Sequence, residues 1–258
     1  MKVQLLPSSI DENGMASMRQ HLLTIVIDDA VAIDAGCLAL SCTAVQRSQI
    51  RDIILTHTHL DHIAGLPLFI DDLFATLTAP IRVHATKEMV ESLERDIFNW
   101  NIYPRFSELR NSVGPVVEYR EFEPGSVFDV GHLTVRAVAV NHQVAANGYL
   151  ISDGSGSVAI TGDTAETDEF WRACDASDDL RAILVECAFP DELAGLAEVS
   201  HHLTPSRLEG EIAKLNDRDI PIYVINIKPM YRESVIRELA LAEIPRLEIL
   251  EIGRQYDF

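Results

Sequence analysis

The sequence predicts a layered α/β (α+β) fold formed by a single domain over residues 1–258. The chain is 47% apolar, which is enough to bury a large core in a domain of this length. Strand-like runs and helix signals alternate in two β-rich halves, at about residues 1–140 and 141–258, each ending in helices. Because no linker-like segment separates the halves, we expect them to share one domain.

The first half contains a histidine-rich motif directly after the apolar run at residues 53–55. Residues 56–62 read THTHLDH. Imidazole and carboxylate are the ligands that zinc, iron and manganese favour, whereas a solvated loop rich in histidine by chance is the alternative interpretation. If the run is a strand and a helix begins near Asp61, His57 and His59 point to one metal. Asp61 and His62 then point to a second.

Two later strand-like runs end in polar residues of the same kind. Residues 133–140 alternate as a half-buried strand does and lead to His142, and the apolar run at 158–161 leads to Asp163. A single His or Asp at a strand end is commonly a turn residue or a helix cap. In combination with the THTHLDH motif, both are candidate metal ligands.

This order of motifs, HxHxDH, then a histidine after a strand, then Thr-Gly-Asp, resembles the metallo-β-lactamase superfamily. The resemblance implies an αββα sandwich with one or two metals at the strand ends. It also implies that the first metal is held by His57, His59 and His142, the second by Asp61 and His62, and that Asp163 bridges the two.

The N-terminal region is similar to the same superfamily. Residues 21–27 and 30–34 predict a hairpin about Asp28 and Asp29, followed by Gly36, as in the early Asp-x-Gly of that family. The resemblance implies that Asp34 orients a ligand histidine from behind the metal site. An ordinary aspartate at a strand end is the alternative.

Several short segments resemble the class II 3',5'-cyclic nucleotide phosphodiesterases within that superfamily. They are HLDHIAG at 59–65, PDEL at 190–193, HLTP at 202–205 and IKP at 227–229. The resemblance places His202 near the scissile phosphate, and Pro205 after Thr204 is typical of a helix start, which leaves His202 on a loop. Lys228 and Arg232 are candidate phosphate contacts, with an ordinary solvated face as the alternative.

The chain departs from the family pattern at Asn226. The family has its last ligand, a histidine, immediately before Ile-Lys-Pro, whereas the strand-like run at 222–225 leads here to asparagine. An amide oxygen is a weaker donor to zinc than imidazole and suits harder ions better. We therefore expect one or two divalent ions, most simply zinc with manganese or iron as alternatives, and a weakened second site.

These residues predict a metal-dependent hydrolase. A water bound to such a metal has its pKa lowered toward neutrality, so that hydroxide can attack a phosphodiester, with Asp61 or Asp163 orienting the water. His202, whose intrinsic pKa is near neutral, is the candidate acid for the leaving oxygen. Another hydrolase of this fold, such as an esterase, sulfatase or lactonase, and a metal-poor binding protein are the alternatives.

Charge restricts the substrate to a small molecule. The formal net charge of -19 repels polyanions, and nucleic-acid affinity comes largely from Lys and Arg that neutralise phosphates. Transfer-RNA-processing relatives carry a long arm between the third-motif histidine and the bridging aspartate, for which residues 143–162 are too few. We expect a small phosphodiester, and no nucleic-acid polymer, as the partner.

The remaining features concern the cell compartment, the membrane and a second copy of the chain. Its four cysteines show no metal-type spacing and are expected to be reduced thiols in the cytoplasm: Cys37, Cys42, Cys174 and Cys187. The apolar part of the N-terminus is too short for a signal peptide, and no segment has the length of a membrane span. The aromatic-rich loop at 99–114 is expected to cover the core or to contact a second copy in a homodimer, rather than to close over substrate.

Overall fold

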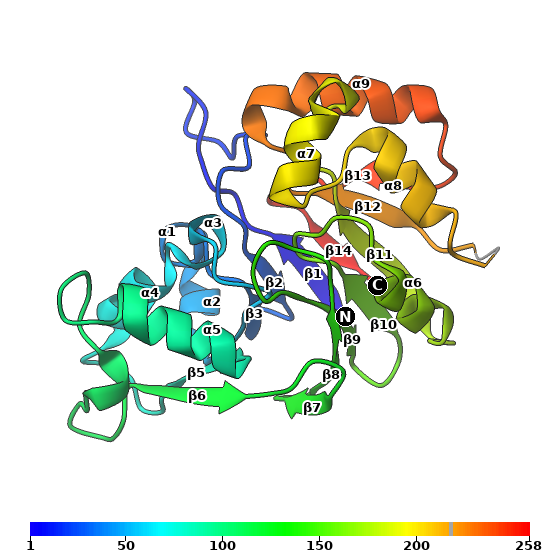
Figure 1. Cartoon of the computed structure of the whole chain (residues 1–258). Helices are drawn as coiled ribbons and strands as arrows, with labels where there is room; N and C mark the ends of the chain where they lie inside the picture. The colour runs from blue at the N-terminus through cyan, green and yellow to red at the C-terminus, as the bar shows by residue number, and fades with distance from the viewer. Residues whose placement is uncertain (217–218) are drawn as a thin grey trace.

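The computed structural model describes residues 1–216 and 219–258, and it contains two β-sheets packed face to face with helices on their outer sides (Figure 1). The first sheet has the strand order β14 (Gln255–Asp257), β1 (Lys2–Leu5), β2 (Ile25–Ile27), β3 (Val31–Ile33), β4 (Asp52–Ile54), β5 (Ile81–Ala85), β6 (Val117–Glu121). The second has the order β13 (Leu247–Ile249), β12 (Ile222–Ile225), β11 (Leu180–Glu186), β10 (Ser157–Ile160), β9 (Asn147–Ser152), β8 (Leu133–Ala139), β7 (Val127–Val130).

Helices cover the outer face of each sheet and complete the four layers. Those on the first sheet are α1 (Leu38–Ser41), α2 (Ala44–Gln49), α3 (Leu60–Ile63), α4 (Leu66–Leu73), α5 (Lys87–Ser92), the π-helical η1 (Leu93–Ile97) and the 3₁₀ turn η2 (Phe106–Glu108). Those on the second are α6 (Asp168–Asp175), η3 (Asp191–Leu193), α7 (Ala194–Ser200), α8 (Pro205–Ile212), η4 (Pro229–Tyr231) and α9 (Arg232–Ala242). The predicted αββα sandwich is confirmed.

Three apolar clusters correspond to the three interfaces between these layers. One joins the inner faces of the two sheets, with Ile54 of the first sheet and Ile160 of the second among its buried members. The second lies between the first sheet and its helices and includes Phe69 of α4. The third lies between the second sheet and α6, α8 and α9, and includes Trp171. Burial of this apolar area stabilises the stack of layers.

Both sheets change from antiparallel to parallel pairing across their width. Strands β14, β1, β2 and β3 are antiparallel neighbours, whereas β3, β4, β5 and β6 run parallel. In the second sheet β7 to β10 are antiparallel and β10 to β13 parallel. The carboxyl ends of the parallel strands lie at the same end of each sheet. The loops that carry polar side chains begin there.

The division into halves differs from the prediction at residue 140. The chain passes from the first sheet to the second between β6 and β7, at residues 122–126, and the last strand, β14, returns to pair with β1. Sequence periodicity identifies the strand at 133–140, which is β8, but not the sheet to which it belongs. The two ends of the chain therefore meet in the first sheet, where the Met1 amino group donates to the Phe258 carbonyl at 2.9 Å.

The predicted hairpin is confirmed by the backbone. The hairpin between β2 and β3 turns at Asp28 and Asp29, whose φ angles of 49° and 58° are those of the tight turn that matches strand twist. In the loop at 99–114, Phe106 is 2% exposed and packs in the cluster between the first sheet and its helices, whereas Trp100 is 57% exposed. Among the described residues, no helix is long and apolar enough to cross a membrane.

Candidate metal centre

The candidate ligands lie on loops that follow strands of both sheets. The THTHLDH motif follows β4, His142 follows β8, Asp163 follows β10 and Asn226 follows β12. Strand β4 belongs to the first sheet and the other three to the second, so the centre lies between the two halves of the sandwich. Folding thus gathers side chains that are up to 169 residues apart, from His57 to Asn226.

Three overlapping groups of side chains have ligand atoms within 4.8 Å of one another. The groups are His57, His59 and His142; His57, His62 and Asp163; and His142, Asp163 and His202. Tetrahedral zinc holds its nitrogen and oxygen ligands at about 2.0–2.2 Å, which requires ligand atoms a few ångströms apart. The first group contains the three histidines that the resemblance assigns to the first metal. The second group contains His62 and Asp163 but has His57 in place of Asp61. Asp61 lies at the edge, with its Oδ2 3.9 Å from Nε2 of His62.

Asp34 and Thr56 fix the proton positions on two of the histidines. His62 donates from Nδ1 to Asp34 at 2.6 Å, and Thr56 donates its hydroxyl proton to the same carboxylate at 2.7 Å. The Thr56 oxygen is then free to accept from Nδ1 of His57 at 3.0 Å. Because Nδ1 is the hydrogen-bonded nitrogen in both rings, each Nε2 faces the site, where it can bind a metal once it carries no proton.

The other two histidines of the first group meet nitrogen to nitrogen. His142 donates from Nδ1 to the backbone carbonyl of His201 at 3.0 Å, which leaves its Nε2 as a lone-pair donor. That Nε2 lies 3.0 Å from Nδ1 of His59. The carbonyl of His201 is available because this residue adopts a φ of 53° at the end of α7. No motif in the sequence indicates this orienting contact.

The three histidines of the first group are held neutral. Burial lowers the pKa of His57 well below its ordinary value and lowers that of His59. Burial also lowers the pKa of His142 to about 4. Neutral imidazole is the form that binds a metal, so these residues are ready to act as ligands at neutral pH.

His62 and the carboxylates form the charged part of the centre. Burial alone would lower the pKa of His62, but the carboxylates of Asp163 and Asp34 raise it well above its ordinary value. Burial would raise the pKa of Asp163, yet the neighbouring histidines, His62 foremost, hold it well below the usual range. The Oδ2 of Asp163 lies 3.3 Å from His62 Nε2 and 3.9 Å from His57 Nε2, between the two ligand sets.

Asn226 reaches the centre, but as a hydrogen-bond donor. Its Nδ2 donates to Oδ1 of Asp163 at 2.6 Å, so the amide contacts the central carboxylate rather than presenting its oxygen to a metal. Its φ of 52° is a conformation that asparagine adopts more readily than most residues. Lys228, two residues on, pairs with Asp61 at 2.9 Å. The structure therefore brings Lys228 to the centre.

His202 is held at the edge of the ligand cluster by a residue that the sequence analysis missed. Its Nδ1 lies 2.7 Å from Oε1 of Glu186, the last residue of β11, and 3.9 Å from Oδ2 of Asp163. Glu186 is fully buried and accepts backbone N–H groups of Thr164 and Ala188. Burial alone would lower the pKa of His202, but Glu186 raises it. The available signal was a charged residue ending a buried apolar strand.

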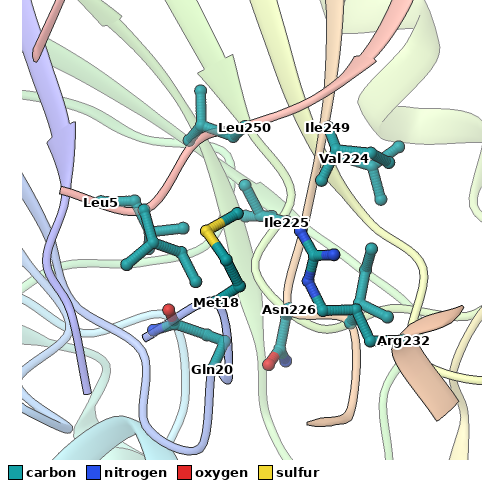
Figure 2. Close-up of a pocket in the computed structure, with 11 residues that line it drawn as sticks. Leu5, Met18, Gln20, Val224, Ile225, Asn226, Arg232, Ile249 and Leu250 are labelled. Carbon is teal, nitrogen blue, oxygen red and sulfur yellow. The ribbon is translucent and has the colours of Figure 1, made fainter. Parts of the chain in front are cut away.

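Cys187 and Arg232 lie outside the ligand cluster. Cys187, which follows Glu186, is buried in the apolar layer, and burial raises the pKa of its thiol well above the usual value, as expected of a packing residue. Arg232 lies away from the ligand cluster, in a pocket that it shares with Asn226 (Figure 2). No hydrogen bond or ion pair of its guanidinium is found within residues 1–216 and 219–258.

A divalent cation fits the residues present. The Nε2 atoms of His57 and His62 are buried without a hydrogen-bond partner, which is costly unless another group binds their lone pairs. Imidazole nitrogens with carboxylate oxygens form the donor set of zinc, iron and manganese sites. The residues that would hold such ions are those of the first two groups together with Asp61.

Comparison with known proteins agrees with this geometry. The chain is 24% identical over 223 residues to a probable 3',5'-cyclic-nucleotide phosphodiesterase of Yersinia pestis, covering 77% of this chain and 63% of that protein. It is 28% identical over 186 residues to a ribonuclease Z of Mycobacterium bovis, covering 68% of this chain and 60% of that protein. The alignments thus span somewhat under two thirds of these relatives.

Comparison with solved structures identifies proteins of the same fold. The crystal structure of unliganded yeast PDE1 superposes with a TM-score of 0.76 at 15% identity, covering 98% of both chains. The family profile described as the beta-lactamase superfamily domain matches residues 25–219, which contain every strand from β2 to β11 and all the candidate ligands except Asn226. This protein therefore belongs to the beta-lactamase superfamily and has the metallo-β-lactamase fold.

Proposed function

We propose that this protein is a metal-dependent phosphodiesterase that hydrolyses a small phosphodiester, such as a 3',5'-cyclic nucleotide. The contact between His202 and Glu186 is the observation that carries the proposal, because it holds an imidazole with a raised pKa, a candidate acid, beside the ligand cluster. Hydrolysis of a phosphodiester with a poor leaving group requires such an acid. The relatives named as phosphodiesterases support the same activity.

Each residue of the centre has a role in this proposal. Bound divalent ions, which we expect to be zinc with manganese or iron as alternatives, would supply Lewis acidity toward the phosphoryl group and lower the pKa of a water molecule. The carboxylates of Asp61 and Asp163 accept hydrogen bonds and so can orient that water. His202 donates its proton to the leaving oxygen, and Glu186 stabilises the imidazolium that is needed for this step.

An RNA substrate is the second candidate, because some relatives are named ribonucleases. Ribonucleases must bind a polyanion over a long surface, and a net charge of -19 opposes that. The short connection between β9 and β10, residues 153–156, also leaves no arm between His142 and Asp163. We therefore favour a small phosphodiester.

The buried thiols of Cys37 and Cys187 support our placement of the protein in the cytoplasm.

A substrate panel with purified, metal-loaded protein tests the proposal. The panel contains cyclic nucleotides, bis(p-nitrophenyl) phosphate, a precursor transfer RNA, a carboxylic ester, a sulfate ester and a lactone. We expect the phosphodiesters to be turned over with the highest kcat/KM and the other esters to lag well behind. A higher kcat/KM for the carboxylic ester, the sulfate ester or the lactone would contradict the phosphodiesterase assignment, and a preference for the transfer RNA would contradict the small substrate.

A further inference from the structure

A solvent-open cleft of about 780 Å³ begins beside the metal centre. One wall is the N-terminal segment at 17–21, and the other is the turn at 228–234 that leads into α9. Lys228 lines the cleft while its ammonium contacts Asp61 at the centre, 2.9 Å away. A substrate whose reacting phosphate lies at the centre can therefore extend into this cleft.

The residues that line the cleft carry an excess of positive charge, whereas the whole protein is strongly negative. The lining contains one acidic residue, Glu233, and three Lys or Arg residues, Arg19, Lys228 and Arg232, with His21 beside them. The whole chain has 40 acidic and 21 basic residues, so a basic lining beside the site stands against the general composition. A local excess of positive charge in a cleft favours an anionic ligand there.

Arg232 is the residue of this lining that most clearly lacks a partner. Within residues 1–216 and 219–258, its guanidinium makes no ion pair or hydrogen bond, and burial lowers its pKa. Figure 2 shows its side chain pointing toward Ile225 in a small pocket whose lining contains no carboxylate. Other half-buried arginines are paired, as Arg47 is with Asp72 and Arg207 with Glu166. A partly desolvated guanidinium without an anion is costly, and a bound anion would remove that cost.

We propose that Arg232, with Arg19 on the opposite wall, binds a second phosphate of the substrate, so that the preferred substrate is a small phosphodiester carrying a further phosphate group. The inference rests on the proposed phosphodiesterase function and narrows its substrate class. The planar guanidinium matches a phosphate with two parallel N–H donors, and the two guanidinium charges of Arg232 and Arg19 match a dianion better than a single carboxylate. A simple cyclic mononucleotide would leave this subsite empty.

A matched pair of chromogenic esters tests the proposal. One is the p-nitrophenyl ester of thymidine 5'-phosphate, and the other is the same ester with an added 3'-phosphate. Both have the same reacting phosphodiester and leaving group, so their kcat/KM ratio reports only the second phosphate. We expect the 3'-phosphorylated ester to be favoured about tenfold to a hundredfold, which corresponds to one or two charge-assisted hydrogen bonds.

Variants of α9 assign that ratio to a residue. Arg232→Gln should bring the ratio close to one, and Arg232→Lys should keep part of it, because lysine retains the charge but loses the planar fork. Arg237→Gln, which removes an exposed arginine of the same helix, should leave the ratio as in the parent protein. A ratio near one in the parent protein, or an unchanged ratio in Arg232→Gln, would overturn the inference while leaving the phosphodiesterase function intact.

A binding measurement separates this inference from the proposed function. If neither ester is hydrolysed, the proposed function has failed, and calorimetry with thymidine 3',5'-bisphosphate and thymidine 5'-monophosphate still tests the subsite. Tighter binding of the bisphosphate that is lost in Arg232→Gln supports the subsite. Equal binding of the two nucleotides overturns it.

Discussion

The carboxylate of Asp34 accepts hydrogen bonds from both His62, at 2.6 Å, and the hydroxyl of Thr56, at 2.7 Å. It also accepts the backbone N–H of Thr56 at 2.8 Å. Since Thr56 in turn accepts from His57, a single buried carboxylate fixes the tautomers of two candidate ligands. Both Nε2 atoms are thereby turned toward the metal centre, where a bound ion would take the place of the second proton that the carboxylates hold on His62.

Replacement of Asp34 by alanine should weaken metal binding without removing a ligand. The change leaves the N–H groups of Thr56 and His62 buried without an acceptor, which costs about 1–3 kcal/mol of stability. Loss of such an outer partner typically lowers metal affinity about tenfold to a hundredfold. Competition with a chelator measures the affinity, and Asp178→Ala, at an exposed aspartate, is the control. Unchanged affinity would show that Asp34 does not orient the ligands.

Replacement of His59 by alanine should remove most of the bound transition metal. His59 is one of three neutral imidazoles that converge on one point, and that set forms the tightest part of the site. Mass spectrometry of metal content in the purified protein checks this. His132→Ala, which removes an exposed histidine paired with Asp28, should keep the metal content of the parent protein. Equal metal content in both variants would mean that the ligand assignment is wrong.

The pH dependence of turnover should report the contact between Glu186 and His202. Glu186 raises the pKa of His202, so the protonated acid persists to higher pH and is lost as pH rises through that pKa. Glu186→Gln removes the negative charge and lowers the pKa, so the alkaline decline in kcat should begin at lower pH. A pH profile of both proteins tests this, and coincident profiles would contradict the role of Glu186.

His202→Ala should lower kcat by about a hundredfold to ten-thousandfold and leave metal content unchanged, because a positioned acid is lost. The loss should be smaller for p-nitrophenyl esters, whose leaving group needs little protonation. Parallel assays with a cyclic nucleotide and bis(p-nitrophenyl) phosphate measure both effects. Near-normal turnover of the cyclic nucleotide by the variant would remove the proposed role.

Asn226→His should tighten a weak second metal site. Imidazole is a better donor to zinc than an amide, and histidine tolerates the left-handed φ of 52° at this position better than most residues do. In the parent protein the second ion should be easily lost, so added manganese should raise activity. Calorimetric titration with zinc should show a weak second binding event that strengthens in the variant. A single event in both proteins would instead indicate a mononuclear centre.

Gly36→Ala should destabilise the fold next to the centre. A Cβ at this position would lie 2.0 Å from the backbone oxygen of Asp61 and 2.8 Å from backbone atoms of Leu23. Such overpacking costs about 1–3 kcal/mol or more, and each kcal/mol lowers Tm by about 2–4 °C in a domain of this size. Gly195→Ala, in α7, meets nothing within 4 Å and should stabilise the protein slightly. Thermal unfolding that leaves Gly36→Ala at the parent Tm would contradict this account.

The sequence by itself determined the sandwich, the hairpin at Asp28 and Asp29 and the loops that carry the histidines. These features depend on local periodicity, turn chemistry and the spacing of polar residues after strands. It could therefore place His57, His59 and His142 at strand ends. The resemblance to a known superfamily implied that these three side chains share one metal, and in the structure they lie together.

Only the tertiary structure decided which distant side chains contact one another at the centre. The ion pair between Lys228 and Asp61 joins residues 167 positions apart, and the donation from Asn226 to Asp163 joins residues 63 apart. His202 contacts Glu186, which lies at the end of β11 in the second sheet. Such contacts depend on which strands are neighbours and how the two sheets pack, and local periodicity carries no information about either. The same reason explains why the transition between sheets before β7 could not be predicted.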